Sequence, residues 1–300
     1  MSRKILLIDD DRMQFRLTQA HFSNFRYETF ELEWAETYEE GLARVLGGTY
    51  AACLLDYQLG DRNGLELIRA AMAGGARTPI VFLTAESSER VDIEAMNAGA
   101  LDYLVKGEIS SRTLERSLRY ALKLGDTLEA LRKLATHDQL TSLLNRREFD
   151  RILAEERERS RRFGHPFGLV LLDIDHFKSV NDTHGHPIGD VVLQEVASRL
   201  VHSLRDVDRA ARFGGEELAL IIMQADRKIA REAAERACEL VRRAPFILDS
   251  GLELRITISA GVASMPADAL SRDELVAAAD KALYAAKAQG RNRVVGFEEL

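Results

Sequence analysis

The sequence predicts an α/β domain with a doubly wound, five-stranded parallel sheet, then a helical linker, then an α+β domain of ferredoxin-like or palm-like type. Three observations lead to this prediction. A chain of 300 residues is too long for a single domain with one typical hydrophobic core, and its length suits two domains. Between residues 4 and 123, five β-rich runs alternate with helical patterns. After residue 137, a hairpin pattern lies in the middle of a mixed order of helices and strands.

Composition indicates a soluble globular protein. Apolar residues make up 46% of the chain and charged residues 30%, which is enough to fill cores and coat surfaces. The net charge of −7 argues against non-specific binding to nucleic acid or to an anionic membrane. We see no secretion signal and no membrane-spanning run, so we expect a cytoplasmic protein. Cys53 and Cys238 lie in apolar patterns and are expected to be buried free thiols.

Polar residues end several predicted strands of the first domain. These strands are KILLI, TFELEWA, AACLLD, PIVFLTA and ALDYLVK. Because parallel strands bring their carboxyl ends to one crevice, we expect the terminal polar side chains to meet there. They are Asp9, Asp10, Asp56, Thr84 and Lys106. Three carboxylates repel one another unless a hard cation is present, and a set of oxygen ligands favours Mg²⁺, while a lysine and a hydroxyl can bind phosphoryl oxygens.

Residues 1 to 123 therefore resemble a response-regulator receiver domain. The resemblance implies that a cognate histidine kinase phosphorylates Asp56. It implies Mg²⁺ ligands at Asp9, Asp10, Asp56 and the carbonyl of Gln58. It also implies phosphate sensing and switching by Thr84, Lys106 and the aromatic Tyr103.

The helical pattern continues through residues 112–136 with an apolar seam. The seam consists of Leu114, Leu118, Ala121, Leu128 and Ala135, at spacings of three, four and seven residues. Gly125 lies on the same stripe and weakens it. The pattern leaves two interpretations equally open: a short two-stranded coiled coil, or a helix packed on its own domain. We place the domains at 1–123 and 137–300, with 124–136 as a helical linker or dimer stalk.

In the second domain, the strand PFGLVLLDID is apolar on both faces and is expected at the centre of the sheet, ending at Asp173 and Asp175. A hairpin is expected at RFGGEELALII, with Glu216 at its bend. If the hairpin lies beside the strand, Glu216 approaches Asp173 and the pair binds Mg²⁺ with positions left open for phosphate oxygens. Gly214 and Gly215 allow positive φ and let a polyphosphate approach backbone N–H groups.

Five motifs of this domain resemble a diguanylate cyclase, or GGDEF, domain. They are DQLTSLLNRREF (138–149), DIDHFKSVNDTHGHPIGD (173–190), RFGGEEL (212–218), SAGVAS (259–264) and ADKALYAAKAQGRNRV (279–294). Leu218 stands where phenylalanine is usual, an apolar exchange expected to leave the chemistry unchanged. The resemblance implies condensation of two GTP into cyclic di-GMP and two pyrophosphates, with Mg²⁺ or alternatively Mn²⁺.

The resemblance also implies roles for individual residues. Asp173, the carbonyl of Ile174 and Glu216 would bind the metal ions on the triphosphate. Glu216 is the candidate proton acceptor with Glu217 in support, and Lys178 would offset negative charge in the transition state. Lys287 and Arg291, expected one helical turn apart, would bind the β- and γ-phosphates; the alternative for both is the ordinary cationic end of a helix.

Guanine requires a group that accepts protons from its N1 and N2 positions, which a carboxylate does. Asp190 fits this role, and we expect ATP to be rejected because an unpaired carboxylate is costly. The other predicted substrate contacts are Asn181 on the base edge, His186 nearby and Phe177. A zinc site at His184 and His186 is a weak alternative, since no cysteine lies nearby.

The product has two-fold symmetry, so two active sites must face each other, and a homodimer provides this geometry. This favours the dimer stalk, and phosphorylation would shift the population of productive dimers. The segment RDVD, from Arg205 to Asp208, matches the family's inhibitory product site and predicts product inhibition. The main alternative is a catalytically silent module that senses GTP or cyclic di-GMP. A third interpretation, a receiver that acts on transcription, lacks support because no basic helix-turn-helix pattern follows the first domain.

Overall fold

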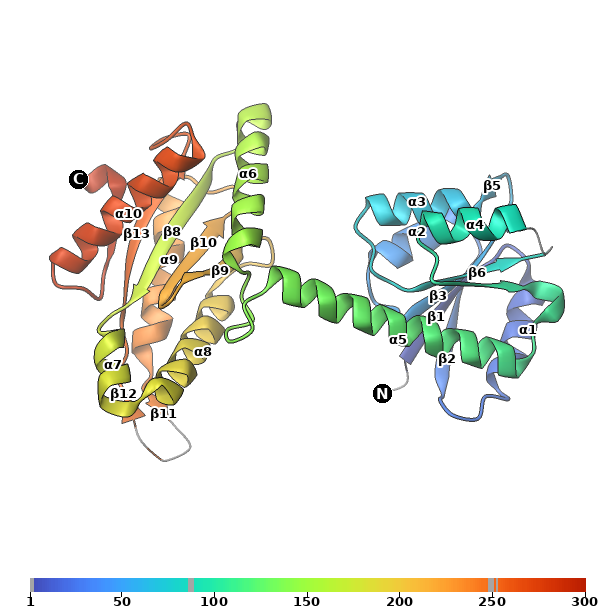
Figure 1. Ribbon diagram of the computed structural model, residues 1–300. Coiled ribbons are helices and arrows are strands. Elements are labelled where there is room, and N and C mark those ends of the chain that lie inside the picture. Colours follow the sequence, from blue (N-terminus) through green and yellow to red (C-terminus); the bar gives the residue numbers. More distant parts are fainter. Residues whose placement is uncertain (1–2, 86–88, 248–250, 252) are drawn as a thin grey trace. The chain divides into compact units, whose positions relative to one another are not determined.

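The computed structural model describes residues 3–85, 89–247, 251 and 253–300 (Figure 1). The chain separates into two compact units, Met1–Arg132 and Lys133–Leu300. The division falls inside helix α5 (Ser111–Thr136), within the predicted linker 124–136. The three predicted domain ranges stay a prediction.

The first unit is a doubly wound α/β domain, as predicted. Its five-stranded sheet has the order β2-β1-β3-β6-β7, and neighbouring strands pair in parallel. Its elements are β1 (Arg3–Ile8), α1 (Arg12–Phe22), β2 (Phe30–Ala35), α2 (Tyr38–Leu46), β3 (Ala52–Asp56), β4 (Gln58–Leu59), β5 (Arg62–Asn63), α3 (Gly64–Ala73), β6 (Ile80–Thr84), α4 (Glu89–Ala98), β7 (Asp102–Val105), η1 (Lys106–Glu108) and the first part of α5.

Both faces of this sheet are covered, because its inner strands are apolar on both sides. All residues of β3 and β6 are buried. One core joins the sheet to α2, α3 and α4, and the other joins it to α1 and α5. The carboxyl ends of the parallel strands therefore meet at one edge, which positions the acidic residues described below.

The second unit is an α+β domain. Its sheet has the order β14-β13-β8-β10-β9, in which only the β13–β14 pair is parallel among the described strands. Its elements are α6 (Arg146–Phe163), β8 (Phe167–Ile174), α7 (Phe177–His184), α8 (His186–Ser203), β9 (Arg209–Gly214), β10 (Glu217–Ile222), α9 (Arg227–Arg243), β11 (Phe246–Ile247), β12 (Glu253–Leu254), β13 (Ile258–Met265), α10 (Arg272–Ala288), β14 (Val294–Gly296) and η2 (Phe297–Glu299).

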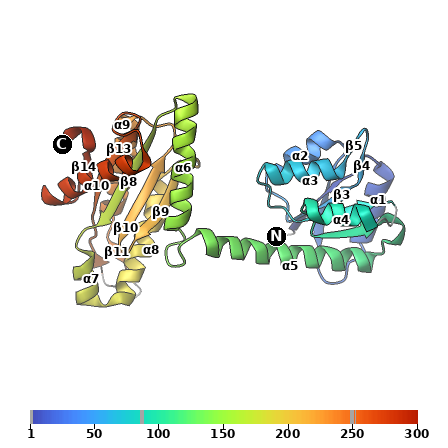
Figure 2. The same cartoon turned by 45° about the horizontal axis from the view of Figure 1, so that its top comes forward.

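The order of β13, β8, β10 and β9 is that of a ferredoxin-like sheet, with β14 added at the edge. The core on one face joins the sheet to α8 and α9, and the core on the other joins it to α6 and α10. Figure 2 shows these helices around the sheet from a second direction. Strand β8 lies between β13 and β10, so the predicted central strand is confirmed.

The structure corrects the predicted strand LELRITISAGVA. Its first residue, Leu252, lies outside the described residues. Glu253–Leu254 pairs with β11 in a separate two-stranded sheet, and the strand of the main sheet begins only at Ile258. Just before this strand, the carbonyl of Thr257 accepts a hydrogen bond from the N–H of Asp175, one residue beyond the end of β8.

Local sequence signals explain where several helices begin. A side-chain oxygen of the residue before each helix accepts a backbone N–H from its first turn, which satisfies one of the unpaired donors there. The capping residues are Asp11, Thr37, Asn63, Asn145, Asp226 and Ser271. None of the described helices is long and apolar enough to cross a bilayer. Cys53 and Cys238 are buried and free, as expected.

Candidate functional site

The first candidate site is the acidic crevice that follows β1 and β3. One side-chain oxygen from each of Asp9, Asp10 and Asp56 lies within 4.8 Å of the others. The Nζ atom of Lys106 lies 2.9 Å from Oδ2 of Asp9 and 2.8 Å from Oδ1 of Asp56. Asp9 and Asp56 are buried, whereas Asp10 is exposed and accepts a hydrogen bond from the N–H of Gly60. The structure thus brings together the carboxylates and lysine predicted at this edge.

Burial controls the charge state of this cluster. It raises the pKa of Asp56 to about 6, although the hydrogen bond from Lys106 opposes the rise. Burial also raises the pKa of Asp9. For Lys106, burial lowers the pKa, but the hydrogen bonds to Asp56 and Asp9 outweigh it and the pKa rises. Two buried carboxylates share one ammonium group, so an oxygen-ligated divalent cation fits this crevice.

The remaining predicted residues of this site lie on the neighbouring strands. Thr84 is buried at the end of β6, and Gln58 begins β4 two residues after Asp56. Tyr103 on β7 is partly exposed, and the charge of Asp92 on α4 raises its pKa. The phosphorylation, sensing and switching roles stay predictions.

Gly64 belongs to the crevice, although it was not among the residues predicted for this site. A Cβ atom on Gly64 would lie 2.2 Å from the carbonyl oxygen of Asp56, so a larger residue would displace the end of strand β3. The only sequence signal was the Asn-Gly pair Asn63–Gly64, which more commonly marks a turn.

The Asp56→Asn variant is expected to stabilise the first unit in the absence of metal, and more strongly at high pH. The folded-state pKa of Asp56 lies above the ordinary value of 3.8 for an aspartate, so wild-type stability falls as the pH rises from about 4 to about 6. A rise of about two pKa units corresponds to about 3 kcal/mol, which sets the upper limit for the gain above pH 6. Thermal unfolding of the wild type and of Asp56→Asn, as full chains in EDTA at pH 4.5 and 7.5, measures this gain in stability.

The matched control for this prediction is Asp10→Asn, which removes the exposed carboxylate of the same cluster. It should change the unfolding temperature less than Asp56→Asn does at pH 7.5. An equal gain for Asp56→Asn at both pH values would contradict the proposed cost of the buried charge.

The second candidate site lies at the carboxyl end of β8. Strand β10 pairs antiparallel with β8, and the ladder places Glu217 directly opposite Asp173. Glu216 lies one residue earlier, partly buried in the bend between β9 and β10. The predicted hairpin beside β8 is therefore confirmed. The approach of Glu216 to Asp173, and of both to a metal with the carbonyl of Ile174, stays a prediction.

The two glycines of the bend differ in conformation. Gly215 has a φ of 42°, as predicted, so it occupies a region that disfavours residues with a Cβ atom. The prediction of positive φ for Gly214 is wrong, because this residue ends β9 and remains paired with Glu217. Only one of the two glycines is needed for the turn itself.

Arg212, an arginine not predicted to belong to the site, holds the bend between β9 and β10. Arg212 donates from Nε to the carbonyl of Gly215 at 3.0 Å. Its Nη1 atom lies 3.2 Å from Oδ1 of Asp138, in the loop before α6. The hydrogen bonds of Thr141 and the charge of Arg212 outweigh burial and lower the pKa of Asp138. Both residues lie in recognised motifs, but nothing in their spacing indicates that they pair.

A lysine near the end of α10 pairs with Asp173. The Nζ atom of Lys287 lies 2.8 Å from Oδ2 of Asp173. The prediction that Lys287 and Arg291 lie one helical turn apart is wrong. Helix α10 ends at Ala288, Gly290 has a φ of 111°, and Arg291 follows with a φ of 62°. The glycine reverses the chain, so Arg291 leaves the helix axis.

The predicted guanine-binding residues lie where α7 meets α8. A Cβ atom on Gly189 would lie 1.9 Å from Oδ1 of Asn181, so glycine next to Asp190 permits this close approach. Asp190 and His186 are exposed at the start of α8, and Lys178 is exposed on α7. Phe177 is buried in the core, so a direct contact of its ring with substrate stays a prediction.

The predicted product site forms a compact turn. Arg205 donates from Nη2 to Oδ1 of Asp208 at 2.9 Å and from Nε to Oδ2 at 3.0 Å. Asp208 is buried and also accepts the N–H groups of Arg205 and Met223. Its carboxylate therefore orients the arginine, whose side chain stays half-exposed.

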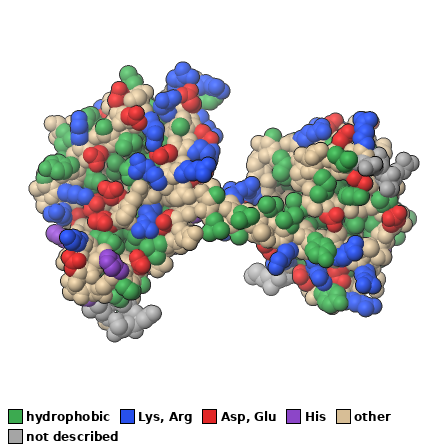
Figure 3. All heavy atoms as spheres, in the orientation of Figure 1, with side chains coloured by type: hydrophobic (Ala, Val, Ile, Leu, Met, Phe, Trp, Pro, Cys, Tyr) green, Lys and Arg blue, Asp and Glu red, His purple; other side chains and the backbone are tan. Residues whose placement is uncertain are grey.

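The two halves of the apolar seam on α5 differ in their burial. Leu114, Leu118 and Ala121 are buried in the core of the first unit, so this half of the seam packs on its own domain. A Cβ atom on Gly125 would lie 2.4 Å from Cγ of Pro79, so the helix still contacts this unit there. Leu128 is 48% exposed, and its apolar neighbours are exposed with it: Leu124, Leu131 and Leu134. Hydrophobic side chains gather on this stretch of α5 in Figure 3.

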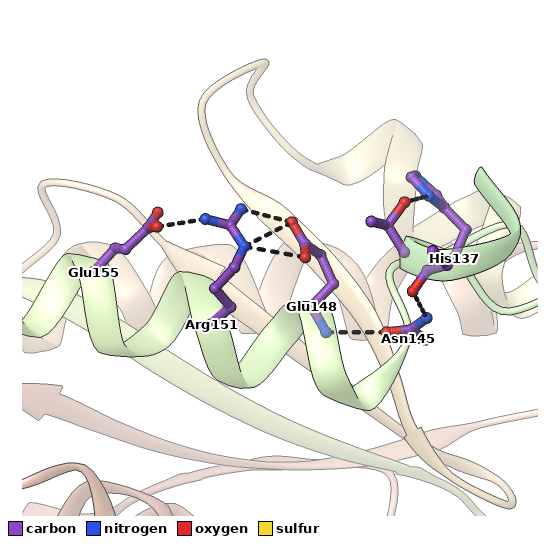
Figure 4. Close-up of polar contacts among 7 residues, drawn as sticks. His137, Asn145, Glu148, Arg151 and Glu155 are labelled. Atoms are coloured by element: carbon purple, nitrogen blue, oxygen red, sulfur yellow. Dashed lines mark hydrogen bonds and ion pairs between the residues drawn. The ribbon is translucent and has the colours of Figure 1, made fainter. Parts of the chain in front are cut away.

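The last turn of α5, which belongs to the second unit, is tied to the start of α6 by the capping residue Asn145. Asn145 accepts the N–H of Glu148 at 2.9 Å as the cap of α6, and its Nδ2 atom donates to the carbonyl of Ala135 at 2.8 Å. Figure 4 shows this joint beside the ion pairs of Arg151 with Glu148 and Glu155. The N–H of Asn145 also donates to the carbonyl of Thr136 at 2.9 Å, so this residue fixes the start of α6 against the last turn of α5 through both its side chain and its backbone.

These two units together define a response regulator in which a receiver domain precedes a GGDEF domain. The family model "Diguanylate cyclase, GGDEF domain" matches residues 135–293, and "Response regulator receiver domain" matches residues 5–119. The first match covers more than half of the chain, so the protein belongs to the diguanylate cyclase GGDEF family.

Similar proteins share this arrangement. Response regulator PleD of Caulobacter vibrioides is 32% identical over 98% of this chain and 65% of its own length. Diguanylate cyclase DgcP of Pseudomonas aeruginosa is 32% identical over 88% of this chain and 37% of its own length. The chain thus spans less than two thirds of these relatives. The solved coiled coil and GGDEF domain of DgcB from Caulobacter crescentus, in complex with c-di-GMP, is 35% identical with a TM-score of 0.55, covering 62% of this chain and 97% of that one.

Proposed function

We propose that this protein is a phosphorylation-regulated diguanylate cyclase that condenses two GTP molecules into cyclic di-GMP and releases two pyrophosphates. The placement of Asp173 carries the proposal. This residue lies near the carboxyl end of the central strand, opposite Glu217, and its carboxylate is 2.8 Å from the ammonium group of Lys287. Membership of the GGDEF family supports the same activity, as do relatives named as diguanylate cyclases.

The carboxylates at the hairpin suit a divalent cation. Asp173, the carbonyl of Ile174 and Glu216 are the proposed ligands for Mg²⁺ or Mn²⁺, which when bound neutralises triphosphate charge and lowers the pKa of the ribose 3′-hydroxyl. Glu216 accepts the proton of that hydroxyl, and Glu217 supports it. The 3′-oxygen forms a bond to the α-phosphate of the facing GTP as the bond to pyrophosphate breaks, and Lys178 offsets the developing negative charge.

Two identical bonds form in the product, so two protomers present their nucleotides to each other. The exposed leucines of α5 are the proposed contact between the two copies. Phosphorylation of Asp56 by a histidine kinase shifts the population towards productive dimers. The Asn145 joint then transmits the position of α5 to α6.

Incubation of the full chain with GTP and Mg²⁺, with and without acetyl phosphate, tests the proposal when nucleotides are resolved by chromatography. We expect cyclic di-GMP in the wild type and more of it with acetyl phosphate. Asp56→Asn should remove the increase without removing the basal activity. GTP binding without any cyclic di-GMP under both conditions would instead support the silent sensing module.

Asp190→Ala is expected to weaken the discrimination between GTP and ATP by about tenfold to a hundredfold, because one carboxylate receives both guanine donors. Binding of each nucleotide, measured by calorimetry, gives the ratio. Asp182→Ala removes an exposed carboxylate on the neighbouring helix α7 and serves as the control. An unchanged ratio in Asp190→Ala would rule out this residue as the guanine reader.

Arg205→Ala is expected to remove product inhibition, since the half-exposed guanidinium is the part of the RDVD turn available to a ligand. Initial rates at low and high added cyclic di-GMP measure it. Arg209→Ala is a matched control, because Arg209 donates to the carbonyls of Asp206, Val207 and Asp208 in the same turn. Wild-type inhibition in the Arg205→Ala protein would refute the site.

A further inference from the structure

A buried carboxylate with no role in the proposed chemistry lies next to the end of β8. Asp175 is 5% exposed. Its Oδ1 atom accepts a hydrogen bond from Oγ of Ser259 at 2.7 Å, and its Oδ2 atom accepts one from Oγ1 of Thr257 at 2.6 Å. Oδ2 also accepts the backbone N–H of Asn292 at 3.0 Å. Because burying a carboxylate is costly, these three fixed donors define one position for it.

The backbone that Asp175 holds is in an unfavourable conformation. Arg291 has a φ of 62° and Asn292 a φ of 48°, so two consecutive residues with Cβ atoms are left-handed. Such backbone persists only where surrounding contacts fix it. The N–H of Arg291 donates to the carbonyl of Ala286 at 3.1 Å, and the N–H of Asn292 donates to Asp175. One hydrogen bond ties the turn to helix α10, and the other ties it to the segment after β8.

We propose that Asp175 is a positioning residue that holds the Arg291–Asn292 turn and so directs Arg291 towards the phosphate tail of a bound nucleoside triphosphate. Asp173, two residues earlier, pairs with Lys287, so the short segment 173–175 contacts both parts of the chain that carry the tail-binding cations. The inference rests on the proposed function, because it requires Arg291 to bind the β- and γ-phosphates. Asp175 itself acts through Asn292 and touches no substrate.

Binding of 3′-deoxy-GTP and of GMP, each with Mg²⁺, tests the inference on the full chain. The first probe carries the phosphate tail but lacks the attacking hydroxyl, and the second lacks the β- and γ-phosphates. Asp175→Ala is expected to weaken 3′-deoxy-GTP binding by about tenfold or more and to leave GMP binding unchanged. Arg291→Ala should show the same selectivity, and the double variant should be no weaker than Arg291→Ala alone. Asp175→Asn retains an acceptor for the N–H of Asn292 and should stay within about threefold of wild type.

The control is a second buried carboxylate of the same unit. The side chain of Asp268 is 1% exposed, accepts the N–H of Ser264 at 2.8 Å and pairs with Arg227. Asp268→Ala should lower the unfolding temperature and leave the ratio of the two affinities as in wild type. Equal losses for both probes in Asp175→Ala would mean a purely structural role and overturn the inference.

Two further results separate this inference from the proposed function. A wild-type protein that binds 3′-deoxy-GTP no better than GMP overturns the proposed function and this inference with it. If Asp175→Ala does not fold, hydrogen exchange of the wild-type protein tests the inference instead. The Asn292 amide lies outside helices and strands, and it is expected to be protected because it donates to Asp175. Exchange of that amide at the rate of an unprotected peptide overturns the inference alone.

Discussion

Asp173→Asn is expected to reduce cyclase activity by about a thousandfold or more while the protein stays folded. The residue is the last but one of the central strand β8, and its Oδ2 atom lies 2.8 Å from Nζ of Lys287, so its charge serves both the proposed metal site and the lysine. Loss of a charged ligand removes several kcal/mol of transition-state stabilisation, and about 1.4 kcal/mol corresponds to each factor of ten. Asparagine preserves the size of the side chain, so packing on β8 is retained.

The measurement is the rate of cyclic di-GMP formation at saturating GTP across a Mg²⁺ titration, with thermal unfolding recorded for each variant. Asp182→Asn, on the exposed face of α7, is the matched control and should retain wild-type activity. Activity within tenfold of wild type in Asp173→Asn would remove the basis of the proposed active site. Recovery of activity at high Mg²⁺ would indicate that the carboxylate contributes metal affinity alone.

Gly261→Ala is expected to destabilise the second unit by about 3 kcal/mol or more, a large effect for one methyl group. A Cβ atom at this position would lie 2.1 Å from the backbone nitrogen of Leu283 and 2.2 Å from the carbonyl oxygen of Ala279. Both atoms belong to the backbone of α10, so they cannot move aside as a flexible side chain could. Either β13 or the whole helix must shift.

A shift of α10 would also move Lys287, so cyclase activity should fall together with stability. Urea unfolding of the full chain, followed by a signal from the second unit, gives the free energy of unfolding. Gly214→Ala is the matched control in the same unit, because a Cβ atom there would lie 3.6 Å from Oε2 of Glu217, an ordinary contact distance, and its effect on stability should stay below about 1 kcal/mol. A loss of less than 1 kcal/mol in Gly261→Ala would show that β13 and α10 can separate at little cost.

The sequence was informative where short-range patterns govern structure. Alternation of apolar runs with helical periodicity predicted the parallel sheet of the first unit, and the fold class of both units is confirmed. Strand β8 is apolar on both faces, which only an inner strand requires, and it lies between β13 and β10. The carboxylates after β1 and β3 meet because parallel strands end at the same edge.

The sequence was less informative about contacts between distant segments. The pairing of Asp138 with Arg212 joins residues 74 positions apart, and no local pattern indicates it. The seam of α5 illustrates the same limit, since periodicity marks an apolar face but does not say what covers it. Leu118 is buried by its own unit, whereas Leu128 on the same helix is exposed.

By itself, the sequence determined which residue types the protein places at the ends of its strands and at the bend of its hairpin, because strand and turn propensities act over a few residues. Tertiary structure alone decided which of them meet: Lys287 with Asp173, and Asp175 with the Arg291–Asn292 turn. The physical reason is that helix α10 ends in a glycine-assisted reversal. The turn after this reversal is fixed by the hydrogen bond from the N–H of Asn292 to Asp175, which joins residues 117 positions apart and forms only in the folded domain.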